Sequence, residues 1–266
     1  MVRSCLVWSR SWAASVGHAA LTGVALVVAT AALSAAPPKP EVPPVSTFAP
    51  ADKLAAEATA LLASCETAVA DEAGFKDQAG QLARDAATLA TVALALGLHD
   101  TDNAFKKNAP ALVAAAAELA DAGDFAAAKA GVAKLKAANE GKGEGEPLVW
   151  KNVATMGPIM KQSTGLYNKL KRGMAGARFK SRADENARSA AALAVIGQAV
   201  LFDTDYVEGD GDIAKWQKFC TDWREAAAGL GKSIKDGDAK AANDWLIKLD
   251  KSCTECHQTF KVEVKE

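Results

Sequence analysis

The sequence predicts an all-α protein built as two tandem four-helix bundles. Alanine, the strongest helix former, dominates the composition, and its commonest neighbours are Leu, Lys, Glu and Asp. Half of the 266 residues are hydrophobic but only 6% are aromatic, and few short stretches favour strands. Two series of helical segments are separated by a glycine-rich stretch, and the two series share residues at matching positions.

The charge of the chain gives no sign of a nucleic-acid partner. Lys and Arg together number 31 against 32 Asp and Glu, so the formal net charge is −1. No block of like charge stands out along the sequence. We therefore expect no nucleic acid among the partners, because such partners are usually bound through a basic patch.

Residues 1–36 predict an export signal. They contain no acidic residue, and Arg3 and Arg10 precede an apolar run over residues 19–36 that closes on small side chains. This pattern is typical of a secretory signal peptide cut just before Pro37. The alternative is an uncleaved N-terminal anchor, because the run approaches the roughly 20 apolar residues of a membrane helix. In either case we expect a periplasmic or otherwise exported chain, with a membrane contact only if the segment is retained.

A proline-rich spacer is predicted over residues 37–50. Its paired prolines cannot continue a helix and favour an extended, polyproline-like conformation. A disordered new N-terminus is the alternative interpretation.

Four helices are predicted in residues 51–138, the first expected bundle. Helical patterns without a breaker run over residues 51–71, 76–98, 104–122 and 124–138. Asp124 suits the N-cap of the fourth helix. The next stretch, residues 139–147, is rich in glycine and charge and predicts a flexible linker.

Four more helices are predicted in residues 148–266, the second expected bundle. They cover residues 148–172, 180–202, 212–235 and 239–260. With the linker before them, they complete two series of four helices each.

The two series match each other well enough to predict a tandem duplication. Aligned without gaps, residues 75–96 and 179–200 agree at four positions besides several alanines. The four matches are Phe75 with Phe179, Lys76 with Lys180, Arg84 with Arg188 and Leu89 with Leu193. An Asp-Thr-Asp ends each second helix and a Gly-Asp precedes each fourth helix. We therefore expect one four-helix unit repeated twice, with chance similarity between alanine-rich bundles as the alternative.

A single Cys-x-x-Cys-His motif, at residues 253–257, predicts the chemistry of the chain. Thiols at positions i and i+3 of a helix lie on one face, so Cys253 and Cys256 can bond to the two vinyl groups of one haem. His257 lies on the same side, where its imidazole can bind the iron as proximal ligand. We therefore predict one covalently attached haem c, inside the second bundle.

Other roles for the cysteines and histidines are less well supported by the sequence. A redox dithiol usually follows a strand of a thioredoxin-like fold, and no such strand is predicted. A zinc site would need Cys65 and Cys220 from other helices to complete its four ligands. These two cysteines are instead expected to be buried, with a disulfide between them as the alternative. His99 is expected in an exposed turn.

With this motif, residues 148–261 resemble the cytochrome c prime family, a four-helix bundle whose Cys-x-x-Cys-His lies close to the C-terminus. The supporting residues are Phe179-Lys180, Ile213-Ala214-Lys215-Trp216, Gly237-Asp238 and Cys256-His257-Gln258-Thr259-Phe260-Lys261. Lys261 departs from the arginine that is usual in the family, which keeps the charge but changes the geometry.

Residues 51–138 resemble the same bundle weakly and lack the motif. When the two Gly-Asp turns are matched, Asn139 stands where Cys253 stands in the second copy. We therefore expect a haem-free first bundle whose core is filled by its own Leu, Val and Ala side chains.

The resemblance implies that the first helix of the second bundle faces the distal side of the iron. Met156 and Met160 lie one turn apart in that helix, so either is a candidate distal ligand, with core packing as the alternative. Methionine there implies six-coordinate iron and electron transfer with a redox partner protein. An open, five-coordinate iron implies binding of a small gas such as nitric oxide or carbon monoxide. No enzyme is expected, because no paired acid and base lies near the motif, and a homodimer is left open.

Overall fold

The computed structural model describes residues 40, 42–207 and 212–260, and this part of the chain is all-helical, as predicted. The predicted export segment, most of residues 37–41 and Lys261 lie outside the described residues. None of the helices in the described part is both long enough and apolar enough to cross a membrane.

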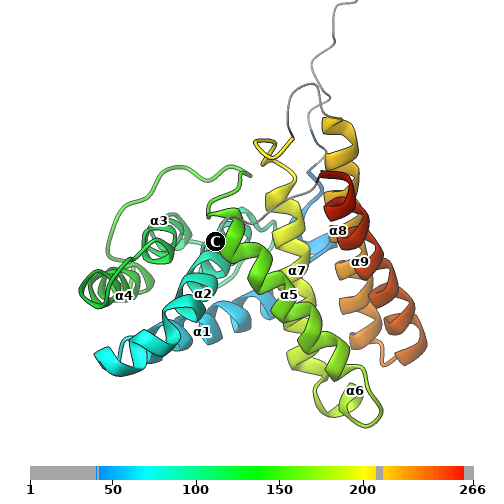
Figure 1. Ribbon diagram of the computed structural model, residues 1–266, viewed down its shortest axis with the longest axis horizontal. Helices are drawn as coiled ribbons and strands as arrows, with labels where there is room; N and C mark the ends of the chain where they lie inside the picture. The colour runs from blue at the N-terminus through cyan, green and yellow to red at the C-terminus, as the bar shows by residue number, and fades with distance from the viewer. Residues whose placement is uncertain (1–39, 41, 208–211, 261–266) are drawn as a thin grey trace, which may run out of the picture. The chain divides into compact units, whose positions relative to one another are not determined.

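The first half of the described chain, residues 45–139, contains a short 3-10 helix, η1 (Val45–Thr47), and four α-helices. The α-helices are α1 (Ala51–Ala68), α2 (Glu72–Leu98), α3 (Ala109–Ala120) and α4 (Phe125–Asn139). Each packs against the next one in the chain, and α3 and α4 lie side by side beyond α2 (Figure 1).

The second half, residues 156–260, contains one short helix among four long ones. Its helices are α5 (Met156–Gly173), α6 (Arg178–Ser181), α7 (Ala183–Val200), α8 (Ile213–Lys235) and α9 (Ala239–Phe260). The long helices pack in the order α5, α7, α8 and α9, and α8 and α9 run side by side at the edge of this half (Figure 1).

Aspartates start the helices in both halves. The side chains of Asp71 and Asp124 accept hydrogen bonds from Gly74 N and Ala127 N, each at 2.8 Å. In the second half, the side chains of Asp212 and Asp238 accept from backbone N–H groups three residues on, at 2.8 and 2.9 Å. These N-caps satisfy donors that the first turn of a helix leaves unpaired, and the predicted cap at Asp124 is confirmed.

Two predicted helix starts are wrong, because in each case a proline sets the residue at which the helix begins. The helix predicted over residues 104–122 begins only at Ala109, with Pro110 in its first turn. The helix predicted from residue 148 begins at Met156, with Pro158 again in the first turn. Proline is accommodated there because the first turn needs no donor from it, whereas inside a helix it removes a hydrogen bond.

The segment predicted as one helix over residues 180–202 is split at Arg182. The short α6 ends there, and α7 begins at Ala183. The last helix, α9, covers the predicted residues 239–260.

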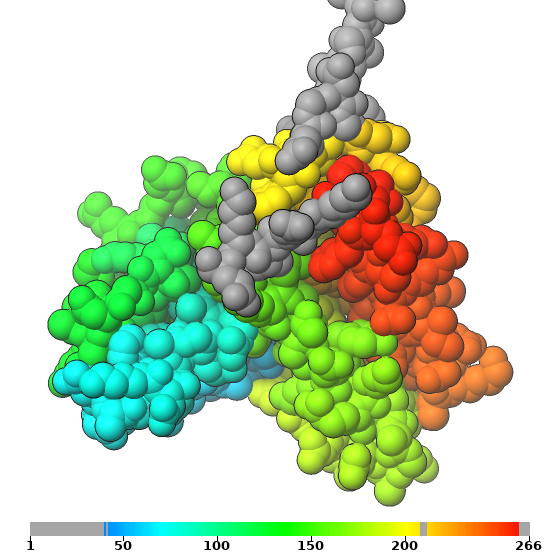
Figure 2. Space-filling view, in the orientation of Figure 1, coloured from blue at the N-terminus to red at the C-terminus, as the bar shows by residue number. Residues whose placement is uncertain are grey.

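The two central helices are α2 and α7. Residues 85–96 of α2 and 189–200 of α7 are buried without interruption, so these segments face other helices on every side. Besides their neighbours within each half, α2 packs against α5 and α7, and α1 packs against α7. In the space-filling view α5 lies between α2 on one side and α9 on the other (Figure 2).

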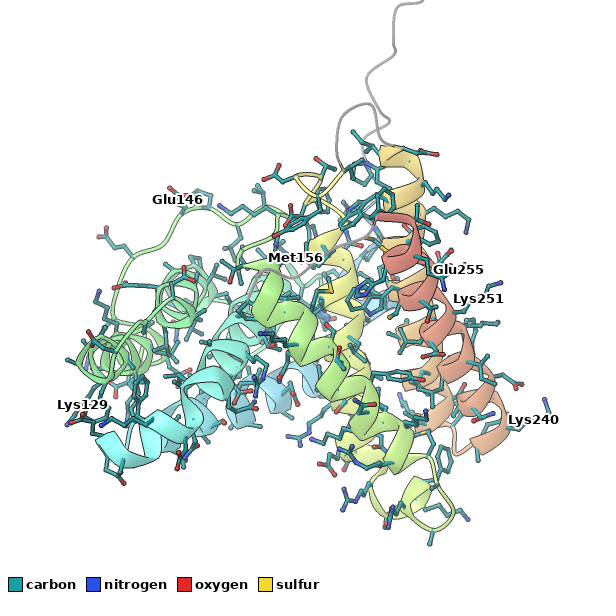
Figure 3. All side chains as sticks on the ribbon, viewed as in Figure 1. Lys129, Glu146, Met156, Lys240, Lys251 and Glu255 are labelled. Carbon is teal, nitrogen blue, oxygen red and sulfur yellow. The ribbon has the colours of Figure 1, made fainter. Side chains whose placement is uncertain are left out.

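The segment predicted as a linker is exposed but lies against the first half. Residues 141–147 are exposed, and Glu146 lies on the outside of this segment (Figure 3). A methyl group at Gly145 would overlap the backbone of Pro110, and one at Gly97 would overlap the Leu148 side chain. The chain therefore approaches α2 and α3 closely at these two points.

Candidate functional site

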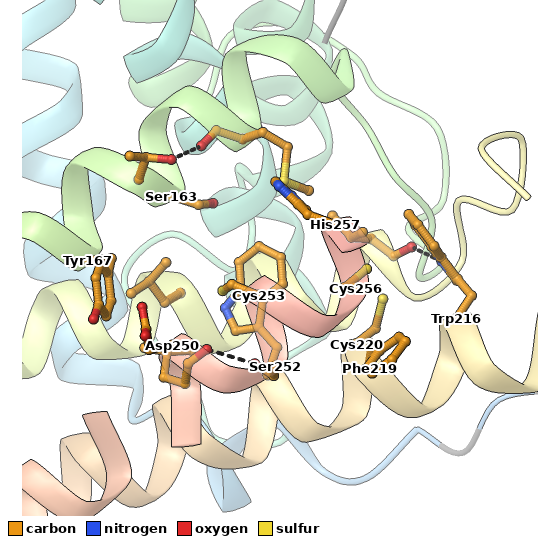
Figure 4. A pocket seen from close by; sticks show the side chains of 16 residues that line it. Ser163, Tyr167, Trp216, Phe219, Cys220, Asp250, Ser252, Cys253, Cys256 and His257 are labelled. Atoms are coloured by element: carbon orange, nitrogen blue, oxygen red, sulfur yellow. Dashed lines mark hydrogen bonds between the residues drawn. The ribbon is translucent and has the colours of Figure 1, made fainter. Parts of the chain in front are cut away.

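A cavity lies between α5, α7, α8 and α9 in the second half (Figure 4). It encloses about 800 Å³ of space, part of which is open to solvent. Apolar and aromatic side chains form most of its wall, with a few polar groups among them. This composition is typical of sites for small molecules and cofactors.

The α9 wall of the cavity contains the three residues predicted from the motif. Cys253 and Cys256 are half-buried and His257 is exposed, and all three line the cavity (Figure 4). The helix is amphipathic, because Leu246 and Leu249 are buried on the same side. The opposite side of α9 carries exposed or half-exposed charges, among them Lys240, Lys251 and Glu255 (Figure 3).

Burial disfavours the thiolate form of both motif cysteines. Burial raises the pKa of Cys253 to about 11, and burial raises the pKa of Cys256 to about 11 as well. Neither forms a disulfide, and Cys65 and Cys220 are also free and are buried. The alternative of a Cys65–Cys220 disulfide is therefore wrong, whereas the predicted burial of both cysteines is confirmed.

The α8 wall is aromatic. Trp216, Phe219 and Trp223 line the cavity together with Cys220, which lies between them on the same face of the helix. The Trp216 indole N–H donates to the Val200 carbonyl oxygen at 3.2 Å, and its ring is 1% exposed. These residues form both the core of the second half and the wall of the cavity, as their spacing predicts.

The Phe260 ring at the end of α9 closes this wall. It meets the Trp216 ring edge-on at a centroid distance of 5.2 Å and the Phe219 ring at 6.3 Å. Such edge-to-face contacts fix the relative position of α8 and α9 beside the motif.

The α5 wall separates the two candidate methionines. Met160 is half-buried and lines the cavity. Met156 is only 2% exposed and packs in the hydrophobic core instead. The spacing of one turn could not decide between them, because it does not fix the rotation of the helix.

Three polar residues of α5 that sequence reasoning missed also line the cavity. Ser163, Thr164 and Tyr167 follow Met160 at helical spacing, which is the pattern that could have found them. The two hydroxyls of Ser163 and Thr164 donate to carbonyl oxygens one turn back in α5, at 2.8 and 3.0 Å. Burial raises the pKa of Tyr167 to about 12, and its hydrogen bond with Asp250 of α9 acts in the same direction.

His99 does not lie in an exposed position, so that expectation is wrong. Its side chain is buried in the first half, where Nδ1 accepts from Thr101 N at 3.0 Å. Nε2 lies 3.0 Å from the Ala49 carbonyl oxygen and donates to it, which assigns the neutral Nε2–H tautomer. The imidazole thus ties η1 to the end of α2 and is remote from the cavity wall.

The residues of the cavity fit a haem group. The wall offers two thiols and an imidazole on one helix, an aromatic surface on the next helix and a thioether on a third. Such a set can hold a haem, because thiols bond to its two vinyl groups and an imidazole or a thioether can bind its iron. Among the described residues, no three His, Cys, Asp or Glu side chains are placed to hold a bare metal ion.

Comparison with known proteins gives no match to a family model, to a curated protein or to a solved structure.

Proposed function

We propose that this chain is an exported c-type cytochrome that binds one covalent haem in the second half and transfers electrons. The observation that carries the proposal is that Cys253, Cys256 and His257 face one apolar cavity that Met160 also lines. In the sequence these residues form the only Cys-x-x-Cys-His motif. The export part of the proposal depends on residues 1–36. Haem of this type is attached to the polypeptide after export, on the far side of the membrane.

In this proposal each wall of the cavity has a separate role. Cys253 and Cys256 hold the group through two thioether bonds, and His257 is the proximal ligand of the iron. The bound haem supplies a one-electron redox couple. Trp216 and Phe219 exclude water from one face, which favours rapid transfer because little solvent must reorganise. Met160 is the candidate distal ligand, and Met156 is a core residue.

We also propose that the chain is a tandem duplication of a cytochrome c prime-like four-helix unit. Helices α1 and α5 both have 18 residues, and a shift of 105 aligns them. That shift pairs buried Leu54 with Ile159 and buried Leu61 with Leu166. It also pairs Cys65 with Leu170, both 0% exposed. The shift of 104 that aligns Phe75 with Phe179 then aligns α2 with α7, so burial and sequence support the same repeat.

Small-gas binding is the second candidate function, and one observation favours it. Met160 is not tightly enclosed, because the cavity beside it is partly open to solvent. If Met160 leaves the iron free, the apolar wall would admit nitric oxide or carbon monoxide. The partner would then be a small molecule and not a redox protein.

Covalent attachment is tested first. Acid–acetone extraction should leave the colour on the polypeptide, and mass spectrometry should place one haem on the peptide that contains residues 253–257. The double variant Cys253→Ala/Cys256→Ala should lose the covalent haem, whereas Cys65→Ala, a buried cysteine of the first half, should keep it. Free extraction of haem from the wild-type chain would refute the proposal.

The distal ligand distinguishes the two functions. We expect a low-spin spectrum for the reduced wild-type protein and slow or no binding of carbon monoxide. Met160→Ala should convert the haem to high spin and open it to carbon monoxide. Met156→Ala is the matched control: it should leave the spectrum unchanged and cost about 2–5 kcal/mol of unfolding free energy. A wild-type protein that is already high-spin and binds carbon monoxide readily would favour gas binding.

A further inference from the structure

The central helices α2 and α7 cover each other at the junction of the two halves. Under the repeat alignment, residues 85–96 of α2 correspond to residues 189–200 of α7, and both segments are buried on every side. An independent bundle would leave one face of its second helix to solvent. The halves therefore share a core at equivalent surfaces.

The packing across this junction is reciprocal. Helix α1 of the first half packs on α7, and α5, its equivalent in the second half, packs on α2. The two second helices, α2 and α7, also pack on each other. A two-fold symmetric dimer has this arrangement, in which each contact between unlike elements occurs twice and one element meets its own copy. Figure 1 shows the four helices together in the middle of the described chain.

Equivalent positions of α1 and α5 make polar contacts across the junction. The Oε2 atom of Glu57 in α1 lies 3.9 Å from the Nε atom of Arg188 in α7. Gln162 of α5, which is equivalent to Glu57, donates from Nε2 to Asp85 Oδ1 of α2 at 3.2 Å. Asp85 is the neighbour of Arg84, the residue equivalent to Arg188. Equivalent positions of α1 and α5 thus meet adjacent positions on the second helix of the other half, and the side chains differ.

The side chains that differ between the halves at these positions are complementary across the junction. Asp85 is 4% exposed and also accepts hydrogen bonds from Ser64 Oγ and Gln81 Nε2, each at 2.6 Å. Its equivalent in the second half is Ser189, whose buried Oγ has no hydrogen-bond partner among the described residues. One half therefore brings two acids to the junction, Glu57 and Asp85, and the other brings Arg188 and Gln162 to meet them.

Pairing of like halves would lose these contacts. Two first halves would place Glu57 of one copy beside both Arg84 and Asp85 of the other, so buried Asp85 would meet an acid where the amide of Gln162 now lies, twice over. Two second halves would place Gln162 against Ser189 and would put the neutral Gln162 beside Arg188 where the acid Glu57 now lies. Such contacts discriminate against the wrong partner even where they add little affinity for the right one.

We propose that the haem-free first half is the permanent partner subunit of the second half. It occupies, within one chain, the surface of α5 and α7 that a second copy would otherwise cover, and the junction has diverged to select this pairing. The proposal rests on the duplication proposed above and does not depend on haem, because its test measures mass.

The test uses the full chain with a specific protease sequence inserted between Gly143 and Glu144, where the chain is exposed. After cleavage, we expect the two pieces to sediment together with the mass of one uncut chain at micromolar concentration. The uncut chain should itself sediment as a monomer. Separation of the wild-type pieces at that concentration, or an uncut dimer cross-linked through α5 and α7, would overturn the proposal.

A side-chain exchange tests the selection. Glu57→Gln/Gln162→Glu keeps the composition and the net charge but places an acid against Asp85. We expect the dissociation constant of the cleaved pieces to rise about tenfold or more, as for other mismatched buried charges. The control exchange, Glu118→Gln/Gln217→Glu, changes the same residue types on α3 and α8 outside the junction and should leave dissociation unchanged.

A rescue variant covers the case in which the exchanged chain does not fold. Adding Asp85→Asn to Gln162→Glu removes the clash of acids and should recover tighter association than Gln162→Glu alone. Equal dissociation constants for the junction and control exchanges, or for the rescue variant and its parent, would contradict the proposed selection.

Discussion

The two halves differ most in their last two helices. In the first half α3 and α4 have 12 and 15 residues, whereas α8 and α9 have 23 and 22. When the two Gly-Asp turns are matched, α4 ends at Asn139, the position equivalent to Cys253, and α9 continues to Phe260. The last pair of helices is therefore longer in the second half than in the first.

The additional turns contain much of the cavity wall. The first turns of α8 provide Trp216, Phe219 and Cys220, and the last turns of α9 provide Cys256 and His257. The first half has turn residues 99–108 where α8 has these extra turns. Under the proposed duplication, a ligand cavity was added to a helical unit by lengthening two helices at one end, while the packed remainder was kept.

The largest loss of stability is expected from a substitution within the added turns of α8. Trp216 is 1% exposed and donates a hydrogen bond to Val200, so Trp216→Ala should lower the free energy of unfolding by about 3–5 kcal/mol. Urea denaturation followed by circular dichroism measures this change. Ile247→Ala on α9, where the side chain is 60% exposed, is the control and should change stability by less than about 0.5 kcal/mol. Similar losses for both variants would show that the added turns are not a packed wall.

A core substitution in the first half should lower the stability of the chain without changing the proposed haem site. Leu135 of α4 is fully buried, so Leu135→Ala should cost about 2–5 kcal/mol. Because its helix does not line the cavity, the visible spectrum should remain that of the wild type. A spectral shift as large as that of Trp216→Ala would contradict the separation of roles between the halves.

A smaller loss of stability is expected at Gly97, where the segment after residue 139 passes close to α2. Gly97→Ala adds a methyl group that would overlap Leu148 and Ala109, and such overpacking costs about 1–3 kcal/mol. Gly123→Ala is the control, because its added methyl group would have no neighbour within 4 Å. Thermal unfolding should show a lower midpoint for the first variant only. Equal midpoints would mean that the segment after residue 139 does not pack on α2.

The smallest effect concerns Glu57 and depends on pH. Burial raises the pKa of Glu57, although the charges of Arg188 and Lys169 act in the opposite direction. Because the folded chain holds this proton more tightly, its contribution to stability is complete below the unfolded pKa and is lost as pH rises through the folded pKa. Glu57→Gln should therefore raise the melting temperature at neutral pH and leave it almost unchanged in acid. A variant that is less stable at neutral pH would show that the pairing with Arg188 outweighs burial.

Much of this architecture follows from local sequence patterns. The helices, the cap at Asp124 and the placement of Cys253, Cys256 and His257 on one face depend on spacing and propensity, which act over a few residues. The wrong helix starts at Ala109 and Met156 have a local cause too, because Pro110 and Pro158 each lie in the first turn of the observed helix.

Other features depend on contacts that no local pattern contains. The choice of Met160 over Met156 for the cavity wall is set by the rotation of α5 against α2 and α7. The burial of His99 needs η1, which brings the Ala49 carbonyl to it from fifty residues away. The complete burial of α2 and α7 likewise arises only when the two halves meet.

The shared position of α2 and α7 also has a consequence for local opening of the chain. An amide exchanges with solvent when its hydrogen bond opens, and the deepest amides exchange only when the whole structure unfolds. Segments 85–96 and 189–200 are enclosed by helices from both halves, so their amides should be the last to take up deuterium. The most durable part of the chain is then the seam between the two halves, and amides of α9 around Cys253 and His257 should exchange earlier than those of the seam.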